Sequence, residues 1–216
     1  MGIVKNIIDD NRFTPEDLPK LEEKLFWEGP KKRISLERFA MLLLLSTIIA
    51  TYGVLKDSTA TVIGAMIIAP LMVPIVATAA ALVMGDLNRA GKALMVVVVG
   101  VTGVVLVAFV CGVIHPIFIS FTTNSQITGR VSPSLGDLIV ALASGVAGAF
   151  AVSRDDVADS LPGVAISISL VPPLAVSGIS LSHGEFLAAS GSFLLFITNF
   201  FSILLAGGLT FVFLGL

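Results

Sequence analysis

Residues Ser58 to Gly85 read STATVIGAMIIAPLMVPIVATAAALVMG, a run of 28 residues that has no charge and carries Pro70 and Pro74 near its middle. A continuous helix of this length would be about 42 Å long, more than the roughly 30 Å hydrocarbon core of a bilayer, so the run predicts a membrane span. Each proline removes an N–H, which leaves the carbonyls of Met66 and Pro70 without a partner along the helix. Such groups are costly in lipid, so we expect a broken helix inside a bundle or beside a hydrated cavity.

The same pattern recurs 99 positions later in the chain. When Gly64 is placed over Gly163, the scarce residues also coincide: Asp57 with Asp156, Pro74 with Pro173, Gly85 with Gly184, and Asp86 with Glu185. Acids, prolines and Gly-acid pairs in one register predict an internal duplication that relates 36–115 to 135–214.

Composition indicates the class of protein. Of 216 residues, 56% are hydrophobic and only 13% are charged, and the apolar residues come in long runs. This is typical of a multi-span membrane protein and excludes a soluble enzyme. The net charge of −2 argues against nucleic acid as a partner, because phosphate binding needs a clustered basic face.

Basic residues predict the topology. We expect six spans, at 39–55, 58–84, 93–113, 135–152, 157–182 and 186–216. If the spans alternate in direction, only Lys56 and Arg130 lie outside. The cytoplasmic side then receives Lys31, Lys32, Arg33, Arg38, Arg89, Lys92 and Arg154. Both termini are then cytoplasmic. The alternative, in which 58–84 re-enters and leaves by one face, would put Arg89 and Lys92 outside.

The fold class that we predict is an all-α polytopic membrane helix bundle. Three spans in a repeat is an odd number, so the two repeats are inverted relative to each other, and the second span of each is broken by proline. The predicted parts are an N-terminal cytoplasmic or interfacial amphipathic segment (1–35), a first transmembrane repeat (36–119), an extramembrane loop (120–134) and a second repeat (135–216).

Within the N-terminal segment, Thr14-Pro15-Glu16-Asp17 carries the residues that start a helix. Leu18, Leu21 and Leu25 then fall on one face of that helix. It is predicted either to lie on the membrane surface or to pack on a neighbour. No signal peptide is expected before it, because a short apolar core with a cleavage site is missing.

Broken helices in inverted repeats are the binding architecture of many secondary transporters. The predicted substrate-binding residues lie at the two breaks and at one polar residue of the last span: Met66, Pro70, Pro74, Ser167, Ser169, Pro172, Pro173 and Asn199. The alternative is that the serines serve close helix packing and that Asn199 clamps two helices together.

Asp57 and Asp156 each stand at the start of a broken span. They are predicted as N-caps that complement the helix dipole, or as ion-binding residues at opposite faces. No charge lies in the middle of a span, which argues against a proton relay built from buried carboxylates.

The sequence contains no candidate set of catalytic residues. The serines have no partner base within the membrane, and neither metal-ligand spacing nor a phosphate-binding loop is present. We therefore expect no enzyme activity, no cofactor and no metal site.

A family resemblance follows from the block Gly64–Met72, GAMIIAPLM, together with Arg38-Phe39 before it and Gly85-Asp86 after it. From Lys32 onward the chain resembles archaeal and bacterial membrane proteins grouped as domain of unknown function 389. The resemblance implies a polytopic bundle in a prokaryotic cytoplasmic membrane, and it names no substrate.

Two functions are therefore open. One is a secondary transporter or channel for a small solute or ion, with the path at the two breaks. The other is a non-transporting structural or sensory membrane protein that recruits a partner through its N-terminal helix. A homo-oligomer is expected in either case, because six short spans enclose little volume.

Overall fold

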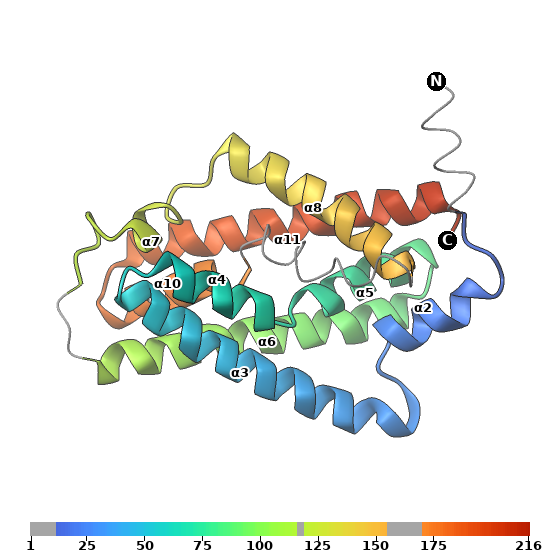
Figure 1. The fold of residues 1–216 in the computed structure, drawn as a ribbon, viewed down its shortest axis with the longest axis horizontal. Helices are drawn as coiled ribbons and strands as arrows, with labels where there is room; N and C mark the ends of the chain where they lie inside the picture. The colour runs from blue at the N-terminus through green and yellow to red at the C-terminus, as the bar shows by residue number, and fades with distance from the viewer. Residues whose placement is uncertain (1–11, 116–118, 155–169) are drawn as a thin grey trace.

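The computed structural model describes residues 12–115, 119–154 and 170–216, and these are helical apart from turns and connections (Figure 1). The elements in chain order are α2 (Asp17–Leu25), the 3-10 turn η1 (Gly29–Lys31), α3 (Lys32–Leu55), α4 (Thr59–Ile68), α5 (Met72–Val83), α6 (Leu87–Ile114), α7 (Ser125–Thr128), α8 (Leu135–Ser153), α10 (Val171–Ser182) and α11 (Phe186–Leu214).

Long apolar helices make this a membrane protein. Helices α3, α6, α8 and α11 belong to stretches long and apolar enough to cross a bilayer, and α4 with α5 forms a bent fifth candidate. Large side chains such as Met41, Leu106, Ile139 and Leu205 are exposed on the four long helices. Apolar surface of this extent would be unfavourable in water and is solvated by lipid chains. Of the expected span 157–182, the structure describes only the second half, α10.

The chain bends by 47° between α4 and α5, at Ala69-Pro70-Leu71. Pro74 is the third residue of α5, and Pro172 and Pro173 are the second and third of α10. A backbone N–H in the first turn has no partner within its helix, so proline removes no hydrogen bond there. Pro74 therefore stands in the first turn of a new helix, whereas the sequence predicted that it would interrupt one.

Two turns, 99 positions apart, have the same geometry. Gly85, two residues after α5, has a φ of 73°, and Gly184, two residues after α10, has a φ of 75°. The following acids donate equivalent backbone bonds, Asp86 N to Ala81 O and Glu185 N to Ser180 O, both 2.9 Å long. Glycine adopts a positive φ without a steric penalty, and this ends both helices in the same way.

Helix directions differ between the two halves of the chain. In Figure 1, α3 and α6 run from the end of the bundle where α2 lies toward the end where α7 lies. Helices α8 and α11 run the opposite way. Helix α5 starts in the middle and ends near α2, whereas α10 ends near α7.

The core lies where the half-helices meet the long helices. Leu71 and Ile75 belong to the same buried cluster as Leu174 and Ile203. Small residues allow close approach: a methyl group at Gly178 of α10 would lie 2.5 Å from the carbonyl oxygen of Val105 in α6. Such contacts replace the hydrophobic effect as the source of helix association in lipid.

Helix α2 packs on the chain's own bundle. Leu21 and Leu25 are 2% and 4% exposed and join the main core cluster, and α2 contacts α5 and α8. The predicted packing on a neighbour is thus made within the same chain, and the placement of α2 on the membrane surface stays a prediction.

Candidate functional site

Helices α5 and α10 begin at the same depth of the bundle. Leu71, which precedes α5, lies beside Gly100 of α6, with a side-chain carbon 3.1 Å from the position of a Cβ there. Helix α10 runs parallel to α6, with Gly178 beside Val105 and Ile179 near Gly112. Its first residue, seven positions before Gly178, therefore lies near the level of Gly100. Two helix N-termini therefore meet at one level, although Pro74, Pro172 and Pro173 supply no N–H groups in these first turns.

Two of the predicted substrate-binding residues have carbonyl groups that are already bonded. The Pro74 carbonyl accepts a hydrogen bond from Thr78 Oγ1 at 2.8 Å, and the Pro173 carbonyl accepts one from Ser192 Oγ at 2.6 Å. All four residues are buried. Such bonds satisfy polar groups within the protein, so a ligand at either carbonyl would share it with a hydroxyl group.

Met66 is also a packing residue. Its side chain is 9% exposed and lies in a second apolar cluster with Val54, Val62, Val176 and Ile179. This cluster joins the end of α4 to α10. Pro70, by contrast, is only half-buried.

The remaining predicted substrate residues divide into two groups. Pro172 and Pro173 are buried in the first turn of α10, and Asn199 in α11 is 4% exposed. Asn199 stands 99 positions after Gly100, the residue beside the start of α5. Asp156, Ser167 and Ser169 lie outside the described residues.

Asp57 holds a loop and does not cap α4. The cap is Ser58, whose side chain accepts from the Thr61 N–H at 3.4 Å, so the predicted capping role of Asp57 is wrong by one position. Asp57 has a φ of 51°, and its Oδ1 accepts from Ser125 Oγ at 2.6 Å and from Gln126 N at 3.1 Å. The Ser125 hydroxyl and then these N–H groups hold the pKa of Asp57 below its ordinary value.

The α7 segment closes this end of the bundle. Asn124 donates from Nδ2 to the Val54 carbonyl at 2.8 Å, and its Oδ1 accepts from Gln126 N and Ile127 N as the N-cap of α7. Arg130 Nη1 donates to the Gln126 carbonyl at 2.6 Å, and burial lowers the pKa of Arg130. The sequence predicted an irregular loop here, although asparagine before Ser125-Gln126 is a helix-start signal.

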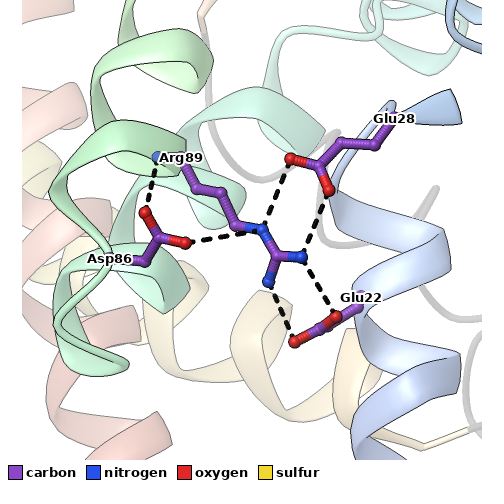
Figure 2. A network of polar contacts seen from close by, with 4 residues as sticks. All are labelled: Glu22, Glu28, Asp86 and Arg89. Atoms are coloured by element: carbon purple, nitrogen blue, oxygen red, sulfur yellow. Dashed lines mark hydrogen bonds and ion pairs between the residues drawn. The ribbon is translucent and has the colours of Figure 1, made fainter.

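At the other end of the bundle, the Arg89 guanidinium lies among three carboxylates, those of Glu22, Glu28 and Asp86 (Figure 2). Its Nη1 lies 2.9 Å from Glu22 Oε1, its Nη2 lies 3.2 Å from Glu28 Oε2, and its Nε lies 3.6 Å from Asp86 Oδ2. The guanidinium carbon also lies 4.9 Å from the centre of the Phe26 ring. Because Glu22 and Glu28 precede Arg89 by more than 60 positions, no local pattern predicted this cluster.

The Arg89 cluster borders a cavity of about 730 Å³ between α2, η1, α5 and α6. Trp27, Lys32, Pro74, Arg89 and Lys92 are among its lining residues. The cavity therefore extends from charged residues at the end of the bundle to the first turn of α5.

Metal binding has no support in 12–115, 119–154 and 170–216, where no three His, Cys, Asp or Glu side chains cluster in a way that could hold an ion.

Comparison with known proteins identifies the family. Residues 66–205 match the family described as Domain of unknown function (DUF389). The chain belongs to this family. An uncharacterized protein of Methanocaldococcus jannaschii is 30% identical over 198 residues, which covers 86% of this chain and 61% of that protein. The chain thus spans about three-fifths of the length of that relative. No solved structure matches.

The DUF389 match begins in the last turns of α4 and ends in α11. It includes α5, α10 and Arg89, whereas Glu22 and Glu28 precede it. The half-helices are therefore part of the family domain.

Proposed function

We propose that this chain resides in a prokaryotic cytoplasmic membrane and moves a small solute or ion between its two half-helices, as a secondary transporter or channel. The observation that carries the proposal is the common depth at which α5 and α10 begin beside α6. Helix ends inside a bundle offer unpaired backbone groups to a ligand, and they are the usual site in transporters with broken helices.

Inverted repeats are part of the proposal. Helices α3 to α6 form the first unit, and α8 to α11 form the second. Three features support this arrangement: the opposite directions of the corresponding long helices, the equal length of α5 and α10, and the matched turns at Gly85 and Gly184. Under this arrangement α4 and α5 together cross the membrane as one broken span, and both termini face the cytoplasm.

Within the site, we assign the ligand contacts to Pro70, Asn199 and the residues just before and within the first turn of α10, including Ser167, Ser169, Pro172 and Pro173. Asn199 supports this assignment because it is a buried amide in an apolar helix, at the position that corresponds to Gly100. We assign Asp57 and Asp156 as ion-binding residues at the two entrances of the path, on opposite faces of the membrane. The bonds from Ser125 and Gln126 already use one Asp57 oxygen, which leaves the other oxygen for this role.

The alternative function, recruitment of a partner through the N-terminal helix, has less support. Leu21 and Leu25 are buried against the bundle, and Glu22 is paired with Arg89. The apolar face of α2 is thus already covered. A homo-oligomer remains part of the proposal, since large apolar faces of α6 and α11 are exposed in the single chain.

Flux into proteoliposomes tests the function. Purified protein is reconstituted, and uptake of H⁺, Na⁺, K⁺ and Cl⁻ is measured one ion at a time with trapped indicators. We expect flux of at least one ion above that of empty vesicles, reduced at least tenfold by Asn199→Leu. Thr198→Val is the control, because that hydroxyl bonds to Leu194 O within its own helix. Folded protein without flux of any of the four ions, or equal flux in both variants, would contradict an ion path at Asn199.

Orientation is tested by labelling. In a Cys111→Ser background, Lys92→Cys and Arg154→Cys are treated with a membrane-impermeant maleimide in intact cells and in inverted vesicles. Labelling of both from the cytoplasmic side alone supports the inverted arrangement. Labelling from opposite sides would exclude it.

A further inference from the structure

The cavity beside Arg89 has two lysines on its rim. Lys32, Lys92 and Arg89 line it, with Glu28 as the counter-charge. The Arg89 guanidinium is held by Glu22 and Glu28, whereas neither Lys32 nor Lys92 forms an ion pair within the described parts of the chain. Both lysines are exposed. The rim therefore offers two free ammonium groups to an anion.

An apolar furrow continues from this cavity along the bundle. It has a volume of about 440 Å³, lies between α3 and α6, and shares Leu36, Met95 and Val96 with the cavity. Farther along, Leu43, Val99 and Gly103 line it. Among the side chains that line the furrow, only Thr47 has an oxygen or nitrogen atom. Its hydroxyl donates a hydrogen bond to the Leu43 carbonyl.

The position of the rim matches that of a lipid headgroup. Lys32 is the first residue of α3, and Lys92 lies in the second turn of α6, so both stand where the exposed apolar faces of these helices begin. Met41 and Met95, farther along α3 and α6, are 59% and 62% exposed. Trp27 lines the same cavity, and tryptophan is enriched at the membrane–water boundary.

We propose that the cavity and the furrow together bind one anionic phospholipid. Its phosphate lies between Lys32 and Lys92, and one acyl chain lies in the furrow between α3 and α6. A second copy of the chain would fill an apolar furrow, but an apolar helix supplies no anion for the two lysines. A phospholipid supplies both the charge and the chain, and each lysine near the surface strengthens such binding about fivefold. This inference does not rest on transport, because lipid binding is measured without flux.

Native mass spectrometry of the full chain in detergent tests the headgroup contact. The probes are phosphatidylglycerol and phosphatidylcholine with identical acyl chains. We expect phosphatidylglycerol to be retained at least tenfold more than phosphatidylcholine, and Lys32→Gln/Lys92→Gln to remove that preference. Lys31→Gln/Lys56→Gln is the matched control, since it removes the same charge at Lys31, which pairs with Glu23, and at Lys56 near the other end of the bundle.

Gly103→Leu tests the furrow. A Cβ at Gly103 meets no atom within 4 Å, and Gly103 lines the furrow, so a leucine side chain there would occupy furrow space. Gly64→Leu is the control, because its Cβ position is equally open and Gly64 lies on α4, outside the furrow. We expect Gly103→Leu to lower retention of phosphatidylglycerol at least fivefold and Gly64→Leu to leave it unchanged.

Three outcomes would overturn the proposal. These are equal retention of the two lipids by the wild type, equal loss in both lysine pairs, and unchanged retention in Gly103→Leu. If Gly103→Leu instead converts a dimer to a monomer while lipid retention stays the same, the furrow is an interface between copies. The unfolding temperature of each variant shows that the protein measured is folded.

Discussion

Ser192 of α11 donates a hydrogen bond to the Pro173 carbonyl of α10, with an Oγ to O distance of 2.6 Å. Both residues are buried, and Ser192 is fully shielded from solvent. The bond ties the first turn of one half-helix to the long helix that follows it. It shows how a hydroxyl in an apolar helix can fix the position of a proline-containing turn.

Ser192→Ala should lower the free energy of unfolding by about 0.5–1.5 kcal/mol, because one buried hydrogen bond is lost. Ser190→Ala is the control, since its exposed hydroxyl bonds only to Leu187 O in the same helix. Unfolding in mixed detergent micelles, followed by circular dichroism, measures both. Equal stability of the two variants would mean that the Ser192 bond contributes little.

Arg89→Gln should release the segment 12–31 from the bundle. The side chain of Arg89 is 23% exposed and joins three carboxylates, so its loss should cost roughly 1–2 kcal/mol, between the values for surface and buried pairs. We expect faster tryptic cleavage at Lys20 and Lys24. Lys92→Gln, one turn farther along α6, should leave the cleavage rate as in the wild type, and equal rates in Arg89→Gln would contradict the prediction.

Asp57 should make the α7 end of the bundle sensitive to acid. Hydrogen bonds from Ser125 and Gln126 lower the pKa of Asp57 from its ordinary 3.8, so the folded state favours the carboxylate. The stabilisation is therefore present above the ordinary value and is lost as pH falls through the lowered pKa. The wild type should unfold at a higher temperature than Asp57→Asn at pH 6, and this difference should shrink below pH 4.

Ser125→Ala provides the control for Asp57. Because the Ser125 hydroxyl is the largest cause of the shift, combining Ser125→Ala with Asp57→Asn should add little to either change alone. Additive effects would mean that the two side chains act separately.

Gly178→Ala should separate α10 from α6. The added Cβ would lie 2.5 Å from the Val105 carbonyl oxygen and 2.9 Å from the Phe109 nitrogen, and backbone atoms of this kind cannot yield without moving a helix. We expect a loss of about 1–3 kcal/mol in stability. Gly103→Ala on α6, where nothing lies within 4 Å, should change stability little. A neutral Gly178→Ala would show that the two helices can move apart at low cost.

Several features of the fold were predictable because they are local. Runs of apolar residues predicted the long helices. The pairs Gly85-Asp86 and Gly184-Glu185, which the sequence placed in one register, lie in matching turns after α5 and α10. The bend at Pro70 follows from the missing N–H of proline. The family resemblance, based on Gly64–Met72, is confirmed by the match of residues 66–205.

Other features needed the tertiary structure. Ser58 caps α4 in place of Asp57, because the bonds to Ser125 and Gln126 of a distant loop engage the Asp57 carboxylate. Met66, Pro74 and Pro173 were predicted as substrate-binding residues. In the structure Met66 packs in an apolar cluster, and the carbonyls of Pro74 and Pro173 accept hydrogen bonds from Thr78 and Ser192. Sequence spacing cannot reveal such partners when they come from another element.

The amino-acid sequence by itself determined that this is an all-helical membrane protein with long apolar helices, and to which family it belongs. These properties depend on hydrophobicity and on backbone constraints within a few residues. Only the tertiary structure decided that α5 and α10 begin at one depth, that Arg89 holds α2 through Glu22 and Glu28, and that Lys32 and Lys92 line a cavity that continues into a furrow. The physical reason is that charge pairing and close packing act between residues that are adjacent in space and far apart along the chain.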